Sequence, residues 1–178
     1  LHDQASNGFA DETVSQSVYD NALPSQFLLP ETLNGIGIKA EYFGDRNFSE
    51  LLATRVEDRI DYETGFLLLP DWHEDRSRSV RWSGTLTATY SEEYTFKVEA
   101  FGDYKLWIDD QLLIDSGNWL GNRDKARITM QAGNPVQLKM EFQPGLLGGY
   151  VKLLWSSKSQ HREVVQKPYL NPPYIPGI

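Results

Sequence analysis

The segment from Tyr94 to Asp115 constrains the fold of this chain more than any other part of the sequence. Residues 94, 96, 98 and 100 are apolar and residues 95, 97 and 99 between them are polar, which is the period of a strand with one buried face. Two further runs of β-forming residues, 105–108 and 111–114, follow directly. Together the three runs predict a β-meander, with a break at Phe101-Gly102-Asp103 between its first two strands.

Asp109 and Asp110 separate the second and third strands of this meander. A two-residue connection is the length that a type I′ hairpin turn uses. The second residue of such a turn requires a positive φ, which glycine adopts freely and aspartate adopts only at some energetic cost. We therefore expect a hairpin turn in which Asp110 is strained, either simply tolerated there or retained for its side chain.

Further β-forming runs, most of them alternating, occur at intervals of roughly ten residues with turn residues between them. They cover residues 35–42, 79–86, 126–130, 136–142, 150–155 and 162–166. Such spacing is typical of an antiparallel sandwich or barrel. The sequence therefore predicts an all-β antiparallel β-sandwich or barrel, with Trp82 and Trp155 in its core because aromatic residues favour strands.

Other segments depart from this alternation. Residues 1–33 are polar and irregular and are interpreted as a linker or arm, 34–173 as the folded domain and 174–178 as a tail. Residues 47–60 carry apolar side chains near helical spacing behind a possible cap at Asn47 or Ser49, which predicts a short helical turn leading into an extended segment. Residues 61–78 hold Gly65, Pro70 and many charges, which predicts a long surface loop.

Composition excludes several classes of function. The chain has 178 residues, of which 40% are hydrophobic, enough for one domain with a single core. Its formal net charge of −8 argues against binding nucleic acid or an anionic membrane through a basic surface. No apolar run approaches the roughly 20 residues that span a bilayer, so no membrane insertion is expected. The chain has no cysteine, so it can form neither disulfides nor thiolate metal sites.

The sequence offers no recognisable catalytic site. His2, His73 and His161 lie far apart and in no metal or triad motif, and there is no cysteine nucleophile. The acidic pairs Glu92-Glu93 and Asp109-Asp110 could in principle act as a glycosidase acid and base. Both pairs stand at predicted turns, where acidic residues are common for solvation and backbone capping. We therefore expect a binding or structural module rather than an enzyme.

Aromatic residues are the chain's main resource for binding, with 5 Trp, 9 Tyr and 8 Phe. Sugars present apolar C–H faces edged by hydroxyls, so a ring that stacks under one face and amides or carboxylates at its edge can hold them. Trp72 beside His73, and Trp119 between Asn118 and Asn122, have this composition. Both are candidate sugar-stacking residues.

Several motifs in a fixed order resemble one known domain family. They are GIKAEYF, SVRWSGTL, YTFKVEA, KLWIDDQLLID with the following loop residue Trp119, ARITMQAGNPVQLKMEF, YVKLLWSS and VVQKPYL. In this order and spacing, from about Gly35 to Pro172, the chain resembles the PA-fourteen family, the protective-antigen N-terminal module. Each motif alone would be weakly specific, whereas their combined order is specific.

The resemblance implies a non-catalytic β-sandwich or barrel that binds carbohydrate and is attached to a larger protein outside the cell, at its surface or in the periplasm. The expected partners are a polysaccharide or oligosaccharide and a neighbouring domain of the same chain, most simply in a polysaccharide-degrading glycoside hydrolase. The alternatives are a structural module that packs on a catalytic domain and shapes its cleft, or an adhesin or toxin module. The candidate sugar-binding residues are Trp72, Asp103, Tyr104, Gln143 and Leu147.

Calcium is the one cofactor that the resemblance raises. Calcium-dependent adhesins of this family use two adjacent aspartates just before the strand that corresponds to KLWID. Here these positions read Phe101-Gly102, followed by Asp103, so the aspartate pair is missing. Hard oxygen ligands are plentiful elsewhere, as at Asp71, Glu74 and Asp75, but no spacing matches an EF-hand loop. No metal site and no cofactor are therefore predicted, with calcium left open as the alternative.

Overall fold

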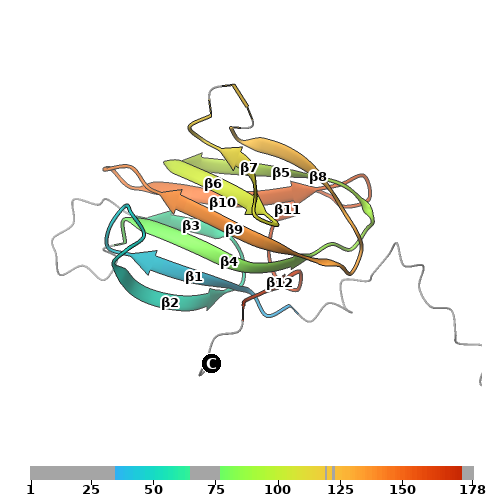
Figure 1. Cartoon of the computed structure of the whole chain (residues 1–178), viewed down its shortest axis with the longest axis horizontal. Coiled ribbons are helices and arrows are strands. Elements are labelled where there is room, and N and C mark those ends of the chain that lie inside the picture. Colours follow the sequence, from blue (N-terminus) through green and yellow to red (C-terminus); the bar gives the residue numbers. More distant parts are fainter. Residues whose placement is uncertain (1–34, 65–76, 119, 122, 174–178) are drawn as a thin grey trace, which may run out of the picture.

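Two antiparallel sheets make up the computed structural model, which describes residues 35–64, 77–118, 120–121 and 123–173 (Figure 1). The residues described contain twelve strands and no helix. The predicted all-β antiparallel sandwich is confirmed. The arm and the tail predicted at the two ends lie outside the described residues, and the domain bounds stay a prediction.

The larger sheet has seven strands in the order β2-β1-β4-β9-β6-β7, with β12 pairing β4 beyond the end of β1. Its strands are β1 (Ile38–Phe43), β2 (Leu51–Glu57), β4 (Ser79–Thr87), β6 (Asp103–Ile108), β7 (Gln111–Asp115), β9 (Pro135–Gln143) and β12 (Leu170–Asn171). Strand β4 lies near the middle of the sheet, and its burial pattern alternates along its length as the sequence predicts.

The smaller sheet has five strands in the order β11-β10-β5-β8, with β3 pairing β10 on the same side as β11. Its strands are β3 (Asp61–Thr64), β5 (Glu92–Phe101), β8 (Lys125–Met130), β10 (Gly149–Ser156) and β11 (Glu163–Val164). Figure 1 shows this sheet lying behind the larger one, with the loops after β7 and β9 projecting from the sandwich.

Aromatic side chains fill the space between the two sheets. Trp82 and Trp155 are both fully buried, which confirms that they are core residues. The ring of Trp155 stacks on that of Tyr94 with centroids 5.0 Å apart, and Tyr62 meets Trp82 edge to face at 6.1 Å. Burying rings of this size contributes about 1.5–3 kcal/mol each, so these contacts dominate the core.

The predicted β-meander is wrong in its first connection. Strand β5 pairs with β8 and β10 in the smaller sheet, whereas β6 pairs with β7 and β9 in the larger one. The chain changes sheets at Gly102, whose φ is 139°, a conformation open almost only to glycine. Periodicity within each strand is a local property, so it could not reveal which strands pair.

The predicted hairpin between β6 and β7 is present, but both of its central residues are strained. Asp109 has φ 47° and Asp110 has φ 62°, as a type I′ turn requires. Asp109 also accepts a hydrogen bond at Oδ1 from the backbone N–H of Gln137 on β9, at 2.7 Å. The Asp109 side chain therefore ties the turn to the neighbouring strand.

Two predictions for the segment between β1 and β4 need correction. Residues 46–47 form a turn and Leu51–Glu57 forms strand β2, so the extended segment that was predicted after the turn is present. The side chain that caps the turn is Asp45, which accepts from the backbone N–H of Ser49 at 3.0 Å. The predicted surface loop 61–78 begins with strand β3, because Asp61–Thr64 pairs with β10, and residues 65–76 lie outside the described residues.

Candidate functional site

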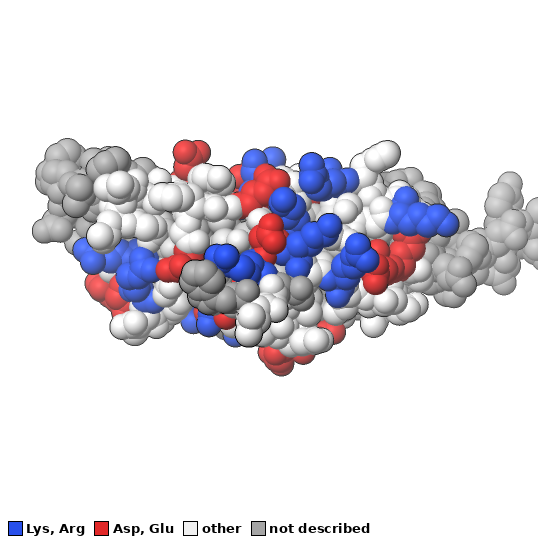
Figure 2. All heavy atoms as spheres, turned by 90° about the horizontal axis from the view of Figure 1, so that it is seen from above, with Lys and Arg blue, Asp and Glu red and all other residues white. Residues whose placement is uncertain are grey.

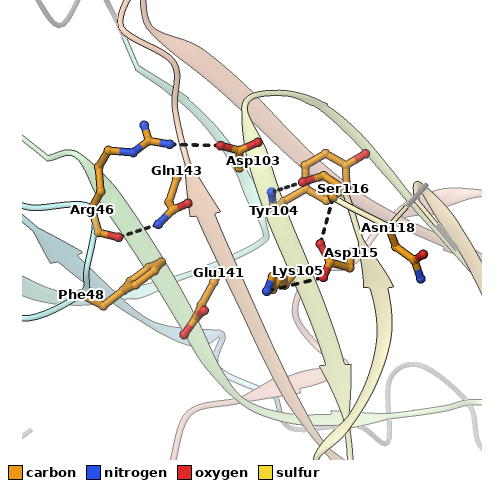
Figure 3. A pocket seen from close by; sticks show the side chains of 11 residues that line it. Arg46, Phe48, Asp103, Tyr104, Lys105, Asp115, Ser116, Asn118, Glu141 and Gln143 are labelled. Carbon is orange, nitrogen blue, oxygen red and sulfur yellow. Dashed lines mark hydrogen bonds and ion pairs between the residues drawn. The ribbon is translucent and has the colours of Figure 1, made fainter. Parts of the chain in front are cut away.

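A groove of about 710 Å³ lies at the end of the larger sheet, on its outer face, where β6 and β9 meet the loop after β1 (Figure 3). It is lined by Arg46, Phe48, Asp103, Tyr104, Lys105, Asp115, Ser116, Gly117, Asn118, Glu141 and Gln143. The volume is in the range of small-ligand sites. The neighbours of its floor residues along β6 and β9, Leu106 and Met140, are fully buried beneath it.

Arg46 joins three separate segments at one end of the groove. Its guanidinium donates to the carbonyl oxygen of Pro144 at 2.7 Å and to Oδ2 of Asp103 at 3.1 Å. Its own carbonyl oxygen accepts from Nε2 of Gln143, as Figure 3 shows. Because β6, β9 and the loop after β1 are all held by this residue, the groove keeps its shape at that end.

The floor of the groove is polar but balanced in charge. Lys105, Glu141 and Arg81 stand directly opposite one another on β6, β9 and β4. Nε of Arg81 lies 2.9 Å from Oε1 of Glu141, and Nζ of Lys105 lies 3.5 Å from Oδ2 of Asp115. Since each charge has a nearby partner of opposite sign, the groove favours neither an anion nor a cation.

Phe48 forms a wall of the groove in an unusual backbone conformation. Its φ is 57°, which is rare for a bulky residue and costs free energy. Its ring meets that of Phe43 edge to face at 5.6 Å, and the Arg81 guanidinium lies 4.8 Å from its centroid. A polar residue such as Asn would adopt this backbone conformation more easily. The Phe48 ring therefore occupies this wall of the groove at a cost in local strain.

Tyr104 and Ser116 extend the β6–β7 pairing beyond its last regular residue. The Tyr104 N–H donates to Oγ of Ser116 and the Ser116 N–H donates to the Tyr104 carbonyl, both at 3.0 Å. Burial raises the pKa of the Tyr104 phenol, and the carboxylate of Asp124 raises it further. The phenol therefore stays protonated at neutral pH and remains a hydrogen-bond donor.

The structure places the predicted sugar-binding residues in different regions. Asp103, Tyr104 and Gln143 line the groove together. Leu147 is 60% exposed in the loop between β9 and β10 and is not among the lining residues. Trp72 lies outside the described residues, as does Trp119. Whether these residues bind sugar stays a prediction.

Sequence reasoning missed most of the lining residues, among them Arg46 and Phe48. Both stand in a short polar turn, GDRNF, without a motif or a periodic pattern. Arg46 is 57 residues from Asp103 and 98 residues from Pro144 along the chain. The unfavourable placement of a bulky aromatic in a turn is the one signal that could have singled out Phe48.

The second position of the family's missing aspartate pair, Gly102, is closed to a side chain. A Cβ on Gly102 would lie 2.7 Å from the carbonyl oxygen of Gln143 and 2.8 Å from the ring of Phe142. Across the described ranges, no three His, Asp or Glu side chains gather in a group that could hold a metal ion. The prediction of no cofactor, with calcium as the open alternative, stays a prediction.

Charged residues of both signs share the edge of the sandwich that carries β7 and β8. Figure 2 shows Lys and Arg near the middle of this face with Asp and Glu between and beside them. On the outer face of the smaller sheet, NH1 of Arg127 lies 3.5 Å from Oε1 of Glu93. In the part of the chain that is described, no helix is both long and apolar enough to cross a membrane.

The model of the PA14 domain family matches residues 35–168, about three quarters of the chain. This chain belongs to the PA14 domain family. It is 32% identical over 139 residues to the anti-sigma-I factor RsgI3 of Acetivibrio thermocellus, covering 78% of the chain and 22% of that protein. It is 28% identical over 144 residues to the protective antigen of Bacillus anthracis, covering 78% and 18%. The chain thus spans about a fifth of the length of these curated relatives.

Solved structures agree with the family. An anti-sigma factor domain-containing protein from Clostridium clariflavum has a TM-score of 0.68 at 34% identity, covering 78% of this chain and 48% of that one. The PA14 sugar-binding domain of an RTX adhesin has a TM-score of 0.59 at 16% identity, covering 77% and 98%. The A domain of epithelial adhesin 6 from Candida glabrata, solved with Galβ1-3GlcNAc, has 0.59 at 14%, covering 82% and 91%. The last two share the fold of this PA14 domain.

Proposed function

We propose that this PA14 domain is a non-catalytic carbohydrate-binding module of a larger protein that acts at or outside the cell surface. The observation that carries the proposal is the groove at the end of β6 and β9, which combines balanced polar groups with aromatic walls. Two PA14-like structures support it by their descriptions, one as a sugar-binding domain and one as a complex with Galβ1-3GlcNAc.

The chemistry of the groove suits a neutral sugar. Sugar hydroxyls both donate and accept hydrogen bonds, and the groove offers the carboxylate acceptor of Asp103 beside the ammonium donor of Lys105. Because the charges of the groove are paired within it or with Arg81, a charged ligand would displace an existing ion pair. A neutral glycan can bind without that cost.

The parent protein is a separate proposal. A glycoside hydrolase is the context that the sequence favours, whereas two relatives at 32% and 34% identity are described as anti-sigma factors. A second candidate is therefore a glycan-sensing module of a regulatory protein, with the same groove as its binding site. The domains that flank this chain in its parent would distinguish the two candidates.

Affinity electrophoresis of the 178-residue chain against a panel of plant and microbial polysaccharides tests the proposal. We expect retardation on at least one neutral polymer, and the same retardation in the presence of EDTA because no metal site is predicted. Phe48→Asn removes the aromatic wall and also relieves the strained backbone, since Asn accepts a positive φ. This variant should keep its stability within about 1 kcal/mol while its affinity falls about tenfold.

Leu112→Asn is the matched control for this substitution. Leu112 is an apolar residue of β7, 45% exposed, and it does not line the groove. Its replacement should leave binding unchanged. A wild-type chain that no polysaccharide retards would remove the proposed function and favour a structural module that packs on a neighbouring domain.

A further inference from the structure

Phe101 and Tyr150 form an exposed aromatic pair on the outer face of the smaller sheet. They are directly opposite each other on β5 and β10, so their Cβ atoms lie about 4.5–5.5 Å apart and their side chains point the same way. Phe101 is 57% exposed and Tyr150 is 48% exposed. Within the described residues, neither ring makes a ring contact or an ion pair, so both are available to a ligand.

The pair stands out from the rest of this face. The other outward positions of β5 are all polar, as expected for a solvated strand: Glu93, Thr95, Lys97 and Glu99. Leu146 and Leu147, 77% and 60% exposed, belong to the adjoining loop. The ring of Phe101 lies 3.9 Å from where a Cβ on Gly145 would stand, so this loop borders the aromatic pair. Single exposed apolar residues are ordinary, but a contiguous group marks a binding surface.

Polar groups border the aromatic pair on the other side. Glu63 on β3 stands directly opposite Tyr150, so Phe101, Tyr150 and Glu63 form one row across the smaller sheet. In the next row Glu99, Lys152 and Asp61 stand opposite one another on β5, β10 and β3, and Nζ of Lys152 lies 3.6 Å from Oδ2 of Asp61. A flat aromatic surface with carboxylates at its edge matches the C–H face and the hydroxyls of a sugar ring.

The charge of this surface selects the class of glycan. Glu63, Glu99 and Asp61 face one cation, Lys152, and the whole chain carries a formal charge of −8. A polymer of uronic acids would be repelled by this field. A neutral polysaccharide would not.

The platform and the groove lie on the opposite outer faces of the sandwich, at the end where the chain crosses from β5 to β6. Asp103, which lines the groove, is two residues from Phe101, a separation of at most about 7 Å along the backbone. A long polysaccharide reaches both surfaces only by passing around this end of the sandwich, whereas a disaccharide fits one of them.

We propose that Phe101 and Tyr150 form a second glycan-binding surface, an aromatic platform on the face opposite the groove that binds long neutral polysaccharide chains without a metal ion. This inference rests on the proposed carbohydrate-binding function and adds the platform and the class of polymer. The platform stacks against pyranose rings, and the groove on the opposite face binds sugar units separately.

The test compares the wild-type chain with the double variant Phe101→Ala/Tyr150→Ala and the control Leu120→Ala. Leu120 is fully exposed and lines neither surface. Native gels contain hydroxyethyl cellulose, glucomannan, xylan or polygalacturonate, and calorimetry uses cellobiose, mannobiose and xylobiose. On the neutral polymers that retard the wild type, the double variant should bind at least about fivefold more weakly and the control equally well. The affinity for the disaccharides should not change in the double variant.

Several results would overturn the platform. Equal retardation of the double variant and the wild type would show that the two rings do not bind polymer. Strongest wild-type retardation on polygalacturonate would contradict the neutral class. Loss of self-association in the double variant, measured by sedimentation without any change in polymer binding, would assign the surface to a protein partner.

The same experiment separates failure of the platform from failure of the proposed function. If Phe48→Asn weakens disaccharide binding while the double variant behaves as wild type, the groove binds sugar and the platform does not. If the wild type binds none of the polymers and none of the disaccharides, the carbohydrate-binding function itself is wrong and the platform is wrong with it.

Discussion

Substitution of Gly102 by alanine should destabilise this domain strongly, because Gly102 is where the chain passes from one sheet to the other. Its φ of 139° is a conformation that residues with a Cβ rarely adopt. The added Cβ would also lie 2.7 Å from the Gln143 carbonyl oxygen and 2.8 Å from the Phe142 ring. Neither neighbour can move freely, since Phe142 is fully buried and Gln143 ends strand β9.

The size of the effect follows from these two causes. A residue forced into a glycine-only conformation costs about 1–3 kcal/mol, and an overpacked core contact costs a further 1–3 kcal/mol, roughly. We expect a loss of about 3 kcal/mol in the free energy of unfolding. For a chain of this length each kcal/mol changes the melting temperature by roughly 2–4 °C, so Gly102→Ala should melt about 6–12 °C lower.

Gly145→Ala is the matched control for Gly102→Ala. A Cβ on Gly145 would have its nearest neighbours at 3.5 Å and 3.9 Å, which is ordinary contact distance. Both variants lose the same glycine entropy in the unfolded chain, so their difference isolates the strain at the sheet crossing. Urea unfolding followed by tryptophan fluorescence measures it. A Gly102→Ala variant within about 0.5 kcal/mol of Gly145→Ala would refute the reasoning.

Two further predictions concern the hairpin turn and the behaviour at alkaline pH. Asp110→Gly relieves a positive φ, and among the described residues the Asp110 side chain makes no hydrogen bond or ion pair that would be lost. Asp109→Gly also loses the hydrogen bond to β9, so the first variant should be more stable than the second by about 1 kcal/mol in urea unfolding. Equal stability would contradict the role of Asp109. Burial raises the pKa of Tyr169 to about 12, so the unfolded chain ionises first and stability should fall between about pH 10 and pH 12. Tyr169→Phe cannot ionise, so this fall should be smaller in the variant; an unchanged pH profile would exclude Tyr169 as its cause.

The sequence was most informative where structure follows from local patterns. The alternation of apolar residues along β4, β5, β9 and β10 predicted which side chains are buried, because a strand with one solvated face must place its apolar residues on the other. The two-residue Asp109-Asp110 link predicted a hairpin because the type of a turn depends only on the backbone of adjacent residues. The family was identifiable because its motifs occur in a fixed order along the chain.

Pairing between strands and the assembly of the groove depended on the tertiary structure. The residues around Gly102 do not show whether β6 pairs with β5 in one sheet or crosses to the other sheet. In both cases strand β5 ends at a break after Phe101. Arg46 and Phe48 carry no motif, and Asp103 meets Arg46 only because the sandwich closes around a common core. The aromatic pair Phe101 and Tyr150 is likewise formed by register across two strands 49 residues apart in sequence. Such contacts depend on long-range packing, so the sequence determined the strands and their buried faces, and the fold decided which exposed residues act together.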